Sequence, residues 1–315
     1  MPSEQALTEA DREKRSVALV SVFAAVLLTA LKLAVGLATG SLGIIAEAAH
    51  SGIDLVAALM TWLAVRISGK PADSRHTYGH GKVENLSALF ETILLLVTCS
   101  WIVYEAADRL LNASVDLEVT FWSYAVMLVS IGVDISRSRK LSRAAKKFNS
   151  QALEADALHF STDVWSSAVV ILGLACVSAS KAFPELAFLV EADAIAAVMV
   201  VLIVVTISVR LGIRTIQALI DAAPPGMREK IVSAVESMPG VIDCHHVRLR
   251  YSGSRLFVDI HVLVDGDQTL REAHEITDRI EESIQNSVPD ADVTVHPEPF
   301  INDEITPPER THADP

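Results

Sequence analysis

Residues 16–40, SVALVSVFAAVLLTALKLAVGLATG, decide the fold of this chain of 315 residues. Lys32 is the one charged residue in the stretch. A helix needs about 20 predominantly apolar residues to span a bilayer, and this stretch exceeds that length. The sequence therefore predicts an α-helical protein that crosses a lipid bilayer.

Five further apolar segments follow the first one. The six segments lie at about 16–40, 41–67, 83–111, 119–135, 152–180 and 193–216. The first, fourth and sixth meet the length requirement most readily. The second, third and fifth are less apolar, so we expect them to be partly shielded from lipid. The pattern predicts an N-terminal arm at 1–15 and a six-helix transmembrane bundle at 16–221.

Basic residues alternate between the connections that join these segments. The N-terminal arm, the second connection and the fourth connection are rich in Lys and Arg, whereas the first, third and fifth are poor in them or acidic. Basic connections face the cytoplasm, so both termini are expected there. The polar first 16 residues show no secretory signal pattern. We expect a multi-pass protein of the cell (inner) membrane.

A Pro/Gly boundary, AAPPG at 222–226, separates the bundle from a polar C-terminal region. An amphipathic helix at 225–238 precedes alternating strands at 241–251 and 256–264. A second helix at 270–287 and a short strand at 292–296 complete an αββαβ order. We expect a cytoplasmic α+β domain of metallochaperone-like type at 222–300. Disorder is expected from about Pro297, and residues 301–315 are assigned as a disordered tail.

The C-terminal third carries most of the negative charge. Residues 222–315 hold 8 Lys/Arg and 18 Asp/Glu, a net −10 of the total −13, and six of the ten histidines. This sign disfavours nucleic acid and favours cations as partners. The three cysteines are widely spaced, which excludes a disulfide framework or a CxxC zinc knuckle.

An HxxxD motif occurs in two of the apolar segments, as His50 and Asp54 in the second and as His159 and Asp163 in the fifth. Residues four apart share a helix face, and ionisable residues at membrane depth are usually functional. Two such faces together offer two imidazoles and two carboxylates, a tetrahedral set that suits Zn²⁺. The alternatives are hydrogen bonding between neighbouring helices and a permanent structural zinc.

Three stretches carry a family resemblance: KLAVGLATGSLGIIAEAAHSGIDL at 32–55, PADSRHTYGHGKVENL at 71–86, and ALEADALHFSTDV at 152–164. With the six-helix order and the acidic C-terminal domain, they resemble the cation diffusion facilitator (CDF) family, in its zinc-transporting type. Bacterial ferrous-iron/zinc efflux pumps of that family are similar. The resemblance implies a homodimeric antiporter, not an enzyme, that exports divalent metal in exchange for protons. It places the transport site on His50, Asp54, His159 and Asp163.

The resemblance implies further sites outside the transport site. Asp73, His76 and His80 would hold metal in a loop, with a solvated interfacial loop as the alternative, and Lys82 would pair with Asp221. The C-terminal set would hold regulatory Zn²⁺ near the dimer contact: His245, His261, His274, His296 and Glu298. In family members an acidic bridging residue is often found at the position of His246. The histidine here puts that bridging role in doubt. Cys244 is a further thiolate candidate, although a lone Cys on a strand is more often packed.

These features predict a proton-coupled exporter of Zn²⁺ that works by alternating access. Two imidazoles disfavour Mg²⁺, Ca²⁺ and Mn²⁺ but leave Cd²⁺, Co²⁺, Ni²⁺ and Fe²⁺ open as the main substrate. A non-transporting membrane metal sensor is an alternative. An intramembrane metalloenzyme is disfavoured, because the sequence contains no HExxH motif, nucleophile elbow or P-loop. We therefore expect no catalytic residues and no bound organic cofactor.

Overall fold

The structure is a computed structural model that describes residues 4–112, 121–182 and 189–300. It divides into two compact units, one made of the long helices in Glu4–Ile220 with Ser252–Ser254, and the other made of Asp221–Tyr251 and the chain from Arg255 onward. Each unit has a core of its own. The predicted fold class, a helical bundle followed by a small α+β domain, is confirmed.

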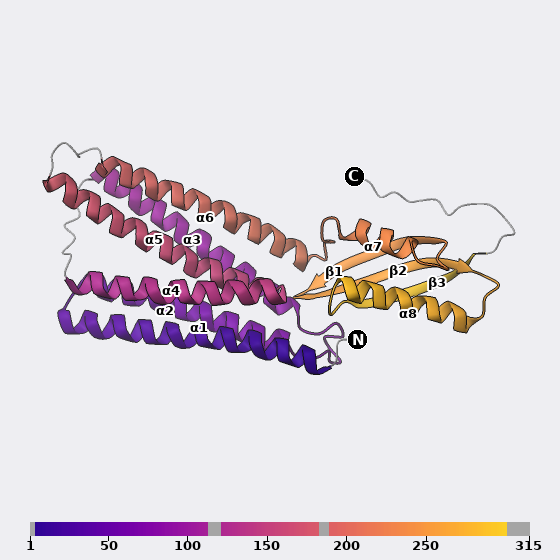
Figure 1. Ribbon diagram of the computed structural model, residues 1–315. Coiled ribbons are helices and arrows are strands. Elements are labelled where there is room, and N and C mark those ends of the chain that lie inside the picture. Colours follow the sequence, from indigo (N-terminus) through magenta and orange to yellow (C-terminus); the bar gives the residue numbers. More distant parts are fainter. Residues whose placement is uncertain (1–3, 113–120, 183–188, 301–315) are drawn as a thin grey trace. The chain divides into compact units, whose positions relative to one another are not determined.

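The first unit is a bundle of long helices (Figure 1). They are α1 (Glu4–Thr39), α2 (Leu42–Ser68), α3 (Lys82–Asn112), α4 (Phe121–Phe148), α5 (Gln151–Ala182) and α6 (Leu189–Leu219). The largest contacts join α1 to α2, α4 to α5, and α3 to α6. α5 also touches α2, α3 and α6, so it lies at the centre of the packing.

Four of these helices contain a described stretch that is long and apolar enough to cross a membrane, at 9–39, 47–68, 82–101 and 201–219. The fourth and fifth predicted segments, 119–135 and 152–180, are not among them. The fourth begins within residues 113–120, which lie outside the description, and it runs directly into a basic stretch. Many large apolar side chains of the bundle are exposed, such as Phe23, Leu27 and Trp101, as a lipid-facing surface requires.

Two helix boundaries differ from the sequence expectation. α1 begins at Glu4, so most of the predicted N-terminal arm is helical and continuous with the first apolar segment. α4 continues to Phe148 and carries the basic residues that we expected in a connection. Only Asn149 and Ser150 separate α4 from α5, and Asn149 makes the turn in the left-handed region with φ 48°.

Small side chains allow the helices of the bundle to approach closely. The main buried cluster joins α1, α2, α4 and α5, and Phe160 is its largest fully buried side chain. The remaining members are mostly alanines: Ala18, Ala25, Ala58, Ala144, Ala145, Ala152 and Ala157, with Val65, Leu141 and Leu153. Helices that pack through alanine bring their backbones near, as membrane bundles do. This packing sets the distance between α2 and α5, which carry the HxxxD motifs.

The second unit has the predicted αββαβ order. Its elements are α7 (Met227–Glu236), β1 (Asp243–Ser252), β2 (Arg255–Asp265), α8 (Leu270–Ser287) and β3 (Asp292–Phe300). The sheet order is β1-β2-β3, and β2 and β3 are parallel with His261 opposite His296. α8 provides the crossover that a parallel pair requires. Alternate residues of β1 and β2 pack with α7 and α8 in one apolar core, around Val235, Ile260 and Ile280.

The third strand is longer than the sequence indicated. β3 continues through Pro297 and Pro299 to Phe300, so the expectation of disorder from about Pro297 is wrong. Proline has no N–H to donate, but an edge strand tolerates it, and β3 lies at the edge of the sheet. The extension places Glu298 in register with Leu263 of β2. The predicted tail at 301–315 lies outside the described residues.

Candidate metal centre

The four residues of the repeated HxxxD motif lie together where α2 and α5 meet. α2 places His50 and Asp54 one turn apart, and α5 does the same for His159 and Asp163. A period of 3.6 residues directs each pair to one side of its helix. The structure therefore brings all four predicted residues into one group.

Each imidazole of this group meets a carboxylate on both helices. His159 Nε2 lies 3.1 Å from Asp54 Oδ1 on α2 and 3.7 Å from Asp163 Oδ2 on its own helix. His50 Nε2 lies 3.9 Å from Asp54 Oδ1 and 3.9 Å from Asp163 Oδ1. Ligand atoms of His50, Asp54 and Asp163 all lie within 4.8 Å of one another. The arrangement can offer two nitrogens and two oxygens to a single cation.

The group is buried unevenly. His159 is 2% exposed and Asp54 is 8% exposed, whereas the His50 side chain is 41% exposed. A buried charge needs a counter-charge or a hydrogen bond, and each carboxylate here faces an imidazole. His50 is thus the less buried histidine of the group.

Two ionisable neighbours of this group were missed by the sequence reasoning. Asp156 lies one turn before His159 and is fully buried, and its Oδ2 accepts a hydrogen bond of 3.4 Å from Ser21. Arg137 of α4 donates to the same hydroxyl at 3.1 Å, and its guanidinium carbon lies 3.4 Å from the ring centroid of Phe160. Asp156 could have been found from its spacing, because it precedes His159 by three residues and so lies on a similar face of the helix. Nothing in the sequence pointed to Arg137, because we expected it in a loop.

The loop residues Asp73, His76 and His80 also come together between α2 and α3. Asp73 Oδ1 lies 3.3 Å from His76 Nδ1, and Asp73 Oδ2 lies 3.4 Å from His80 Nε2. Gly79, at φ 76°, allows the turn that returns His80 to Asp73. Ligand atoms of the three residues lie within 4.8 Å of one another. One carboxylate thus touches two imidazoles, as it would beside a shared ion.

The backbone prepares the Asp73 carboxylate for this role. Its Oδ1 accepts hydrogen bonds from the backbone N–H of His76 at 2.7 Å and of Arg75 at 2.8 Å. These bonds lower the pKa of the Asp73 carboxyl below its ordinary value, the bond from His76 contributing most. The same hydrogen bonds orient the carboxylate toward the two histidines of the loop.

Glu298 joins three histidines on the C-terminal sheet. Its Oε1 lies 2.7 Å from His261 Nδ1 and 3.8 Å from His296 Nε2, and its Oε2 lies 3.2 Å from His245 Nε2. The contact with His261 is the largest of the causes that lower the pKa of the Glu298 carboxyl. Four of the five predicted C-terminal residues therefore form one cluster, supplied by β1, β2 and β3.

His274 is not brought to that cluster within one chain. It lies on α8, which packs with the core side of the sheet, and its imidazole Nε2 lies 3.8 Å from Asp278 Oδ1. Within the described residues it belongs to neither C-terminal group of clustered ligand atoms. Cys244 packs in the apolar core, and burial raises the pKa of its thiol to about 11, which disfavours the thiolate that binds metal.

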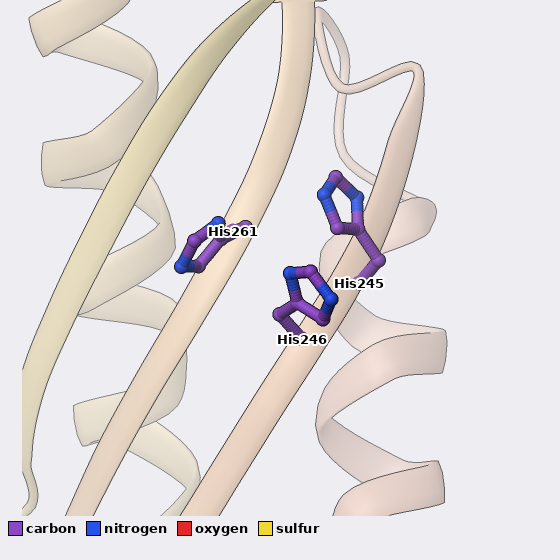
Figure 2. Close-up of side chains that lie close together, drawn as sticks. All are labelled: His245, His246 and His261. Atoms are coloured by element: carbon purple, nitrogen blue, oxygen red, sulfur yellow. The ribbon is translucent and has the colours of Figure 1, made fainter. Parts of the chain in front are cut away.

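His246 was not predicted as a ligand, yet it lies beside His245 and His261 (Figure 2). Strand alternation places neighbours on opposite faces and so argued against this position, and the one signal for it was the family resemblance, in which an acidic bridging residue often stands there. Ligand atoms of the three histidines lie within 4.8 Å of one another.

The predicted Lys82–Asp221 pair involves both units. In the bundle, Lys82 Nζ donates a hydrogen bond of 3.0 Å to the carbonyl oxygen of Leu219. In the second unit, Asp221 Oδ1 lies 3.6 Å from Arg250 Nη1. Because the two residues fall in separate units, their pairing stays a prediction.

Comparison with known proteins agrees with this arrangement. Residues 18–220 match the cation efflux transmembrane domain, and residues 223–300 match the cytoplasmic domain of cation efflux proteins. The cation-efflux pump FieF of Yersinia enterocolitica is 31% identical over 302 residues, covering 95% of this chain and 96% of that protein. FieF of Shewanella oneidensis is 31% identical over 280 residues, covering 89% of this chain and 92% of that protein.

Solved structures match the C-terminal part. CzrB in its zinc form is 28% identical and covers 25% of this chain and 91% of that one, with a TM-score of 0.24. A C-terminal domain of MamM, residues 215–293, is 30% identical; the match covers 23% of this chain and 92% of that one, with a TM-score of 0.22.

Proposed function

The chain belongs to the cation efflux (cation diffusion facilitator) family of membrane transporters, and from this membership we propose that it exports Zn²⁺ from the cytoplasm in exchange for protons. Members of this family are transporters and not enzymes, so efflux of a metal cation across a membrane is the established part of the function. Zinc as the main cargo and the proton as the counter-ion are our proposal.

The observation that supports zinc is the ligand set between α2 and α5. His50 and His159 supply imidazoles, and Asp54 and Asp163 supply carboxylates that neutralise a divalent charge. A tetrahedral N₂O₂ set suits Zn²⁺, whereas Mg²⁺ and Ca²⁺ favour oxygen ligands alone. Cd²⁺, Co²⁺, Ni²⁺ and Fe²⁺ compete for the same set, and the flux experiment below ranks them.

Proton coupling follows from the same side chains. Zn²⁺ requires neutral imidazole and ionised carboxylate, so loading the site displaces protons. If the bundle opens alternately to each side of the membrane, protons that enter from outside displace the metal there. Inward proton flow then drives metal outward, with the four residues serving both ions in turn.

The arrangement in the membrane is also part of the proposal. We place the bundle at 16–221 and the C-terminal domain at 222–300, in the inner membrane with both termini in the cytoplasm. Support comes from the division into two compact units and from the alternation of basic connections. The acidic C-terminal domain then lies on the side from which the cation is collected.

Regulation by zinc and self-association complete the proposal. We propose that the cluster around Glu298 and the loop group around Asp73 hold metal outside the transport path, and the proximity of their ligand atoms, within 4.8 Å of one another, supports this. We propose that the protein is a homodimer and that cytosolic Zn²⁺ at the C-terminal domain couples metal level to transport. The match to the cation efflux cytoplasmic domain, which is a dimerisation domain, supports this arrangement.

Flux into proteoliposomes tests the proposal. Purified protein is reconstituted, and uptake of Zn²⁺ is measured with an imposed pH gradient, with the reverse gradient and with none. We expect Zn²⁺ uptake when the lumen is more acidic than the outside, because protons then leave as Zn²⁺ enters, and no such uptake with the reverse gradient. We also expect uptake of Zn²⁺ to be faster than uptake of Cd²⁺, Co²⁺, Ni²⁺, Fe²⁺ or Mn²⁺. A rate that ignores the gradient would refute proton coupling. Binding without any flux would instead support the alternative of a membrane metal sensor.

A further inference from the structure

We propose that α1 and α4 form a binding site for an anionic phospholipid, with Lys140 and Arg137 beside the headgroup phosphate and an apolar groove along one acyl chain. The site uses none of the candidate metal ligands. The proposal therefore goes beyond the proposed function and does not depend on which ion the protein carries.

A groove lies between α1 and α4. Its volume of about 420 Å³ falls in the range of about 300–1,000 Å³ that is typical of ligand sites. Most of its described lining is apolar, and the larger contribution comes from Val17, Val20 and Ala24 of α1 and from Leu128, Val129 and Val133 of α4. The core of a bilayer contains no water, so lipid chains fill an apolar groove on its surface.

The groove is open at the surface of the bundle. Val20, Leu128 and Val129 are all exposed large apolar side chains. Gly132 also lines the groove, and a Cβ added there would meet nothing within 4 Å. The absence of a side chain at Gly132 therefore leaves room for an acyl chain between the two helices.

Positive charge stands at one end of the groove. Lys140 is exposed, the Arg137 side chain is 5% exposed, and both line the groove. None of the described residues that line it is acidic. Ammonium and guanidinium groups both bind phosphate, the guanidinium often through two hydrogen bonds. A phosphate is therefore the complementary group for this end of the groove.

The length of the groove matches one leaflet of a bilayer. Ser21 contacts Arg137 and Glu13 contacts Lys147, so α1 and α4 run antiparallel and the charged end lies towards the start of α1. Lys140 lies about 18 Å from Leu128 along the axis of α4, at about 1.5 Å per residue. Half of a hydrocarbon core of about 30 Å is about 15 Å. An acyl chain along the apolar part thus brings its phosphate to the level of Lys140.

The surrounding charge favours an anionic lipid over a zwitterionic one. Between Ser136 and Phe148, α4 carries six basic residues and no acidic one. Clusters of about four to eight Lys and Arg beside a membrane helix attract anionic lipids. Phosphatidylcholine has the same phosphate but adds a quaternary ammonium, which a basic segment repels. We therefore expect phosphatidylglycerol to bind more tightly than phosphatidylcholine.

Arg137 has hydrogen-bonding capacity left for the phosphate. Its Nε and Nη2 atoms donate to Ser21 Oγ at 3.3 and 3.1 Å, and its Nη1 atom lies 3.1 Å from Asp134 Oδ1. Within the part of the chain that the structure describes, these contacts use three of the five N–H groups of the guanidinium. Two N–H groups remain for a phosphate oxygen, which would add a second negative partner to a buried positive charge.

Site-resolved labelling tests the proposal in the wild-type protein. The full chain is delipidated in detergent without metal, and an amine-reactive reagent modifies its lysines at increasing phosphatidylglycerol, with rates followed by peptide mass spectrometry. We expect this lipid to slow modification of Lys140 more than that of Lys146, which is exposed on the same basic segment but lies outside the lining of the groove. Phosphatidylcholine with the same chains should protect Lys140 less, and inorganic phosphate should not protect it.

Two variants separate the headgroup from the chain, with binding measured by native mass spectrometry. Lys140→Gln removes a charge and should raise the half-saturating concentration of phosphatidylglycerol about fivefold, which corresponds to about 1 kcal/mol per basic residue. Gly132→Leu fills the groove and should weaken binding of both lipids. The matched controls are Lys146→Gln and Thr206→Leu, because Thr206 is exposed on α6 outside the groove, and both should bind as the wild type does. Thermal unfolding shows that each variant is folded.

Several results would overturn the proposal. Equal protection of Lys140 by both lipids would remove the preference for an anionic headgroup, and equal protection of Lys140 and Lys146 would show diffuse attraction instead of a site. Protection by inorganic phosphate would make a soluble anion the ligand. Unchanged binding of phosphatidylglycerol in folded Lys140→Gln or folded Gly132→Leu would remove the groove from the binding site.

Discussion

The Nε2 atom of His159 on α5 lies 3.1 Å from Oδ1 of Asp54 on α2, so one buried contact joins the two helices that carry the candidate transport ligands. A metal ion bound by both atoms would displace a proton shared between them. Competition between the two ions at one place is what an exchange mechanism requires.

Replacing Asp54 by Asn tests this competition. The amide keeps the volume of the side chain but removes its charge, so the site loses one of two carboxylates that neutralise Zn²⁺. We expect Zn²⁺ flux to fall to the level of empty liposomes. Glu154→Gln is the matched control, because Glu154 lies on α5 and pairs with Arg214 at the surface. Wild-type flux in Asp54→Asn would remove Asp54 from the transport site.

The close approach of α1 and α2 predicts a difference between two glycines. A Cβ on Gly36 would lie 2.9 Å from Ile45 Cγ1 and 3.1 Å from Ile45 N, whereas a Cβ on Gly132 would meet nothing within 4 Å. Alanine stabilises a helix interior by about 0.5–1 kcal/mol relative to glycine at either position. Gly132→Ala should therefore keep or raise the unfolding temperature, and Gly36→Ala should lower it relative to Gly132→Ala. Equal shifts in the same detergent would contradict the tight α1–α2 contact.

A capping box begins α8 and gives a prediction about stability. The Thr269 hydroxyl accepts a hydrogen bond from the backbone N–H of Glu272, and Glu272 accepts one of 2.8 Å from the backbone N–H of Thr269. Replacing Thr269 by Ala removes the cap, which costs about 0.5–2 kcal/mol. Faster hydrogen exchange of the α8 amides should report the loss, with the amides of the bundle helices as the internal control.

The same cap predicts a pH dependence. Hydrogen bonds from Thr269, the backbone one first, lower the pKa of the Glu272 carboxyl. A carboxyl with a lower pKa in the folded state stabilises the fold above its unfolded pKa of about 4.3 and loses that contribution as the pH falls through the folded value. In Glu272→Gln the amide oxygen can still accept the hydrogen bonds of the capping box, but the side chain no longer titrates. The stability of the second unit should therefore depend less on pH in the acid range. An identical acid dependence in both proteins would exclude this carboxyl as a cause.

Local periodicity predicted most of the fold. Spacing of four residues predicted that His50 and Asp54 share a face, and alternation placed Cys244 opposite His245, because both periods follow from backbone geometry alone. The basic residues after 135 misled the prediction for α4. They were read as a loop by charge, although a helix can leave the membrane and continue in water.

The meeting of the two HxxxD helices was predicted, but the detailed contacts between distant elements and the local departures from regular geometry were not. No spacing indicates that His159 meets Asp54 more closely than Asp163. The left-handed backbone of His246 breaks the alternation on which strand reasoning depends. β3 passes through two prolines because it lies at an edge, and strand order is a tertiary property.

In the loop between α2 and α3, substitutions of Asp73 can separate the effect of its negative charge from the effect of its hydrogen bonds to the turn. Asp73 accepts hydrogen bonds from the backbone of Arg75 and His76, and its carboxylate also faces His80. Asparagine at this position can accept the same backbone hydrogen bonds and so preserve the turn. It removes the negative charge, and alanine removes both features.

We therefore expect Asp73→Asn to weaken Zn²⁺ binding at the loop while His76 and His80 keep their positions. The loss should be at least about tenfold, since even an outer partner of a metal ligand is worth about 10–100-fold in affinity. Protection of His80 from diethyl pyrocarbonate by Zn²⁺ measures it, and unchanged protection of His50, whose side chain is 41% exposed, shows in the same sample that the transport site is intact. If Zn²⁺ protects His80 equally in the wild type, Asp73→Ala and Asp73→Asn, Asp73 is not a ligand and serves only the turn. If Zn²⁺ protects His80 in none of the three proteins, the loop holds no metal.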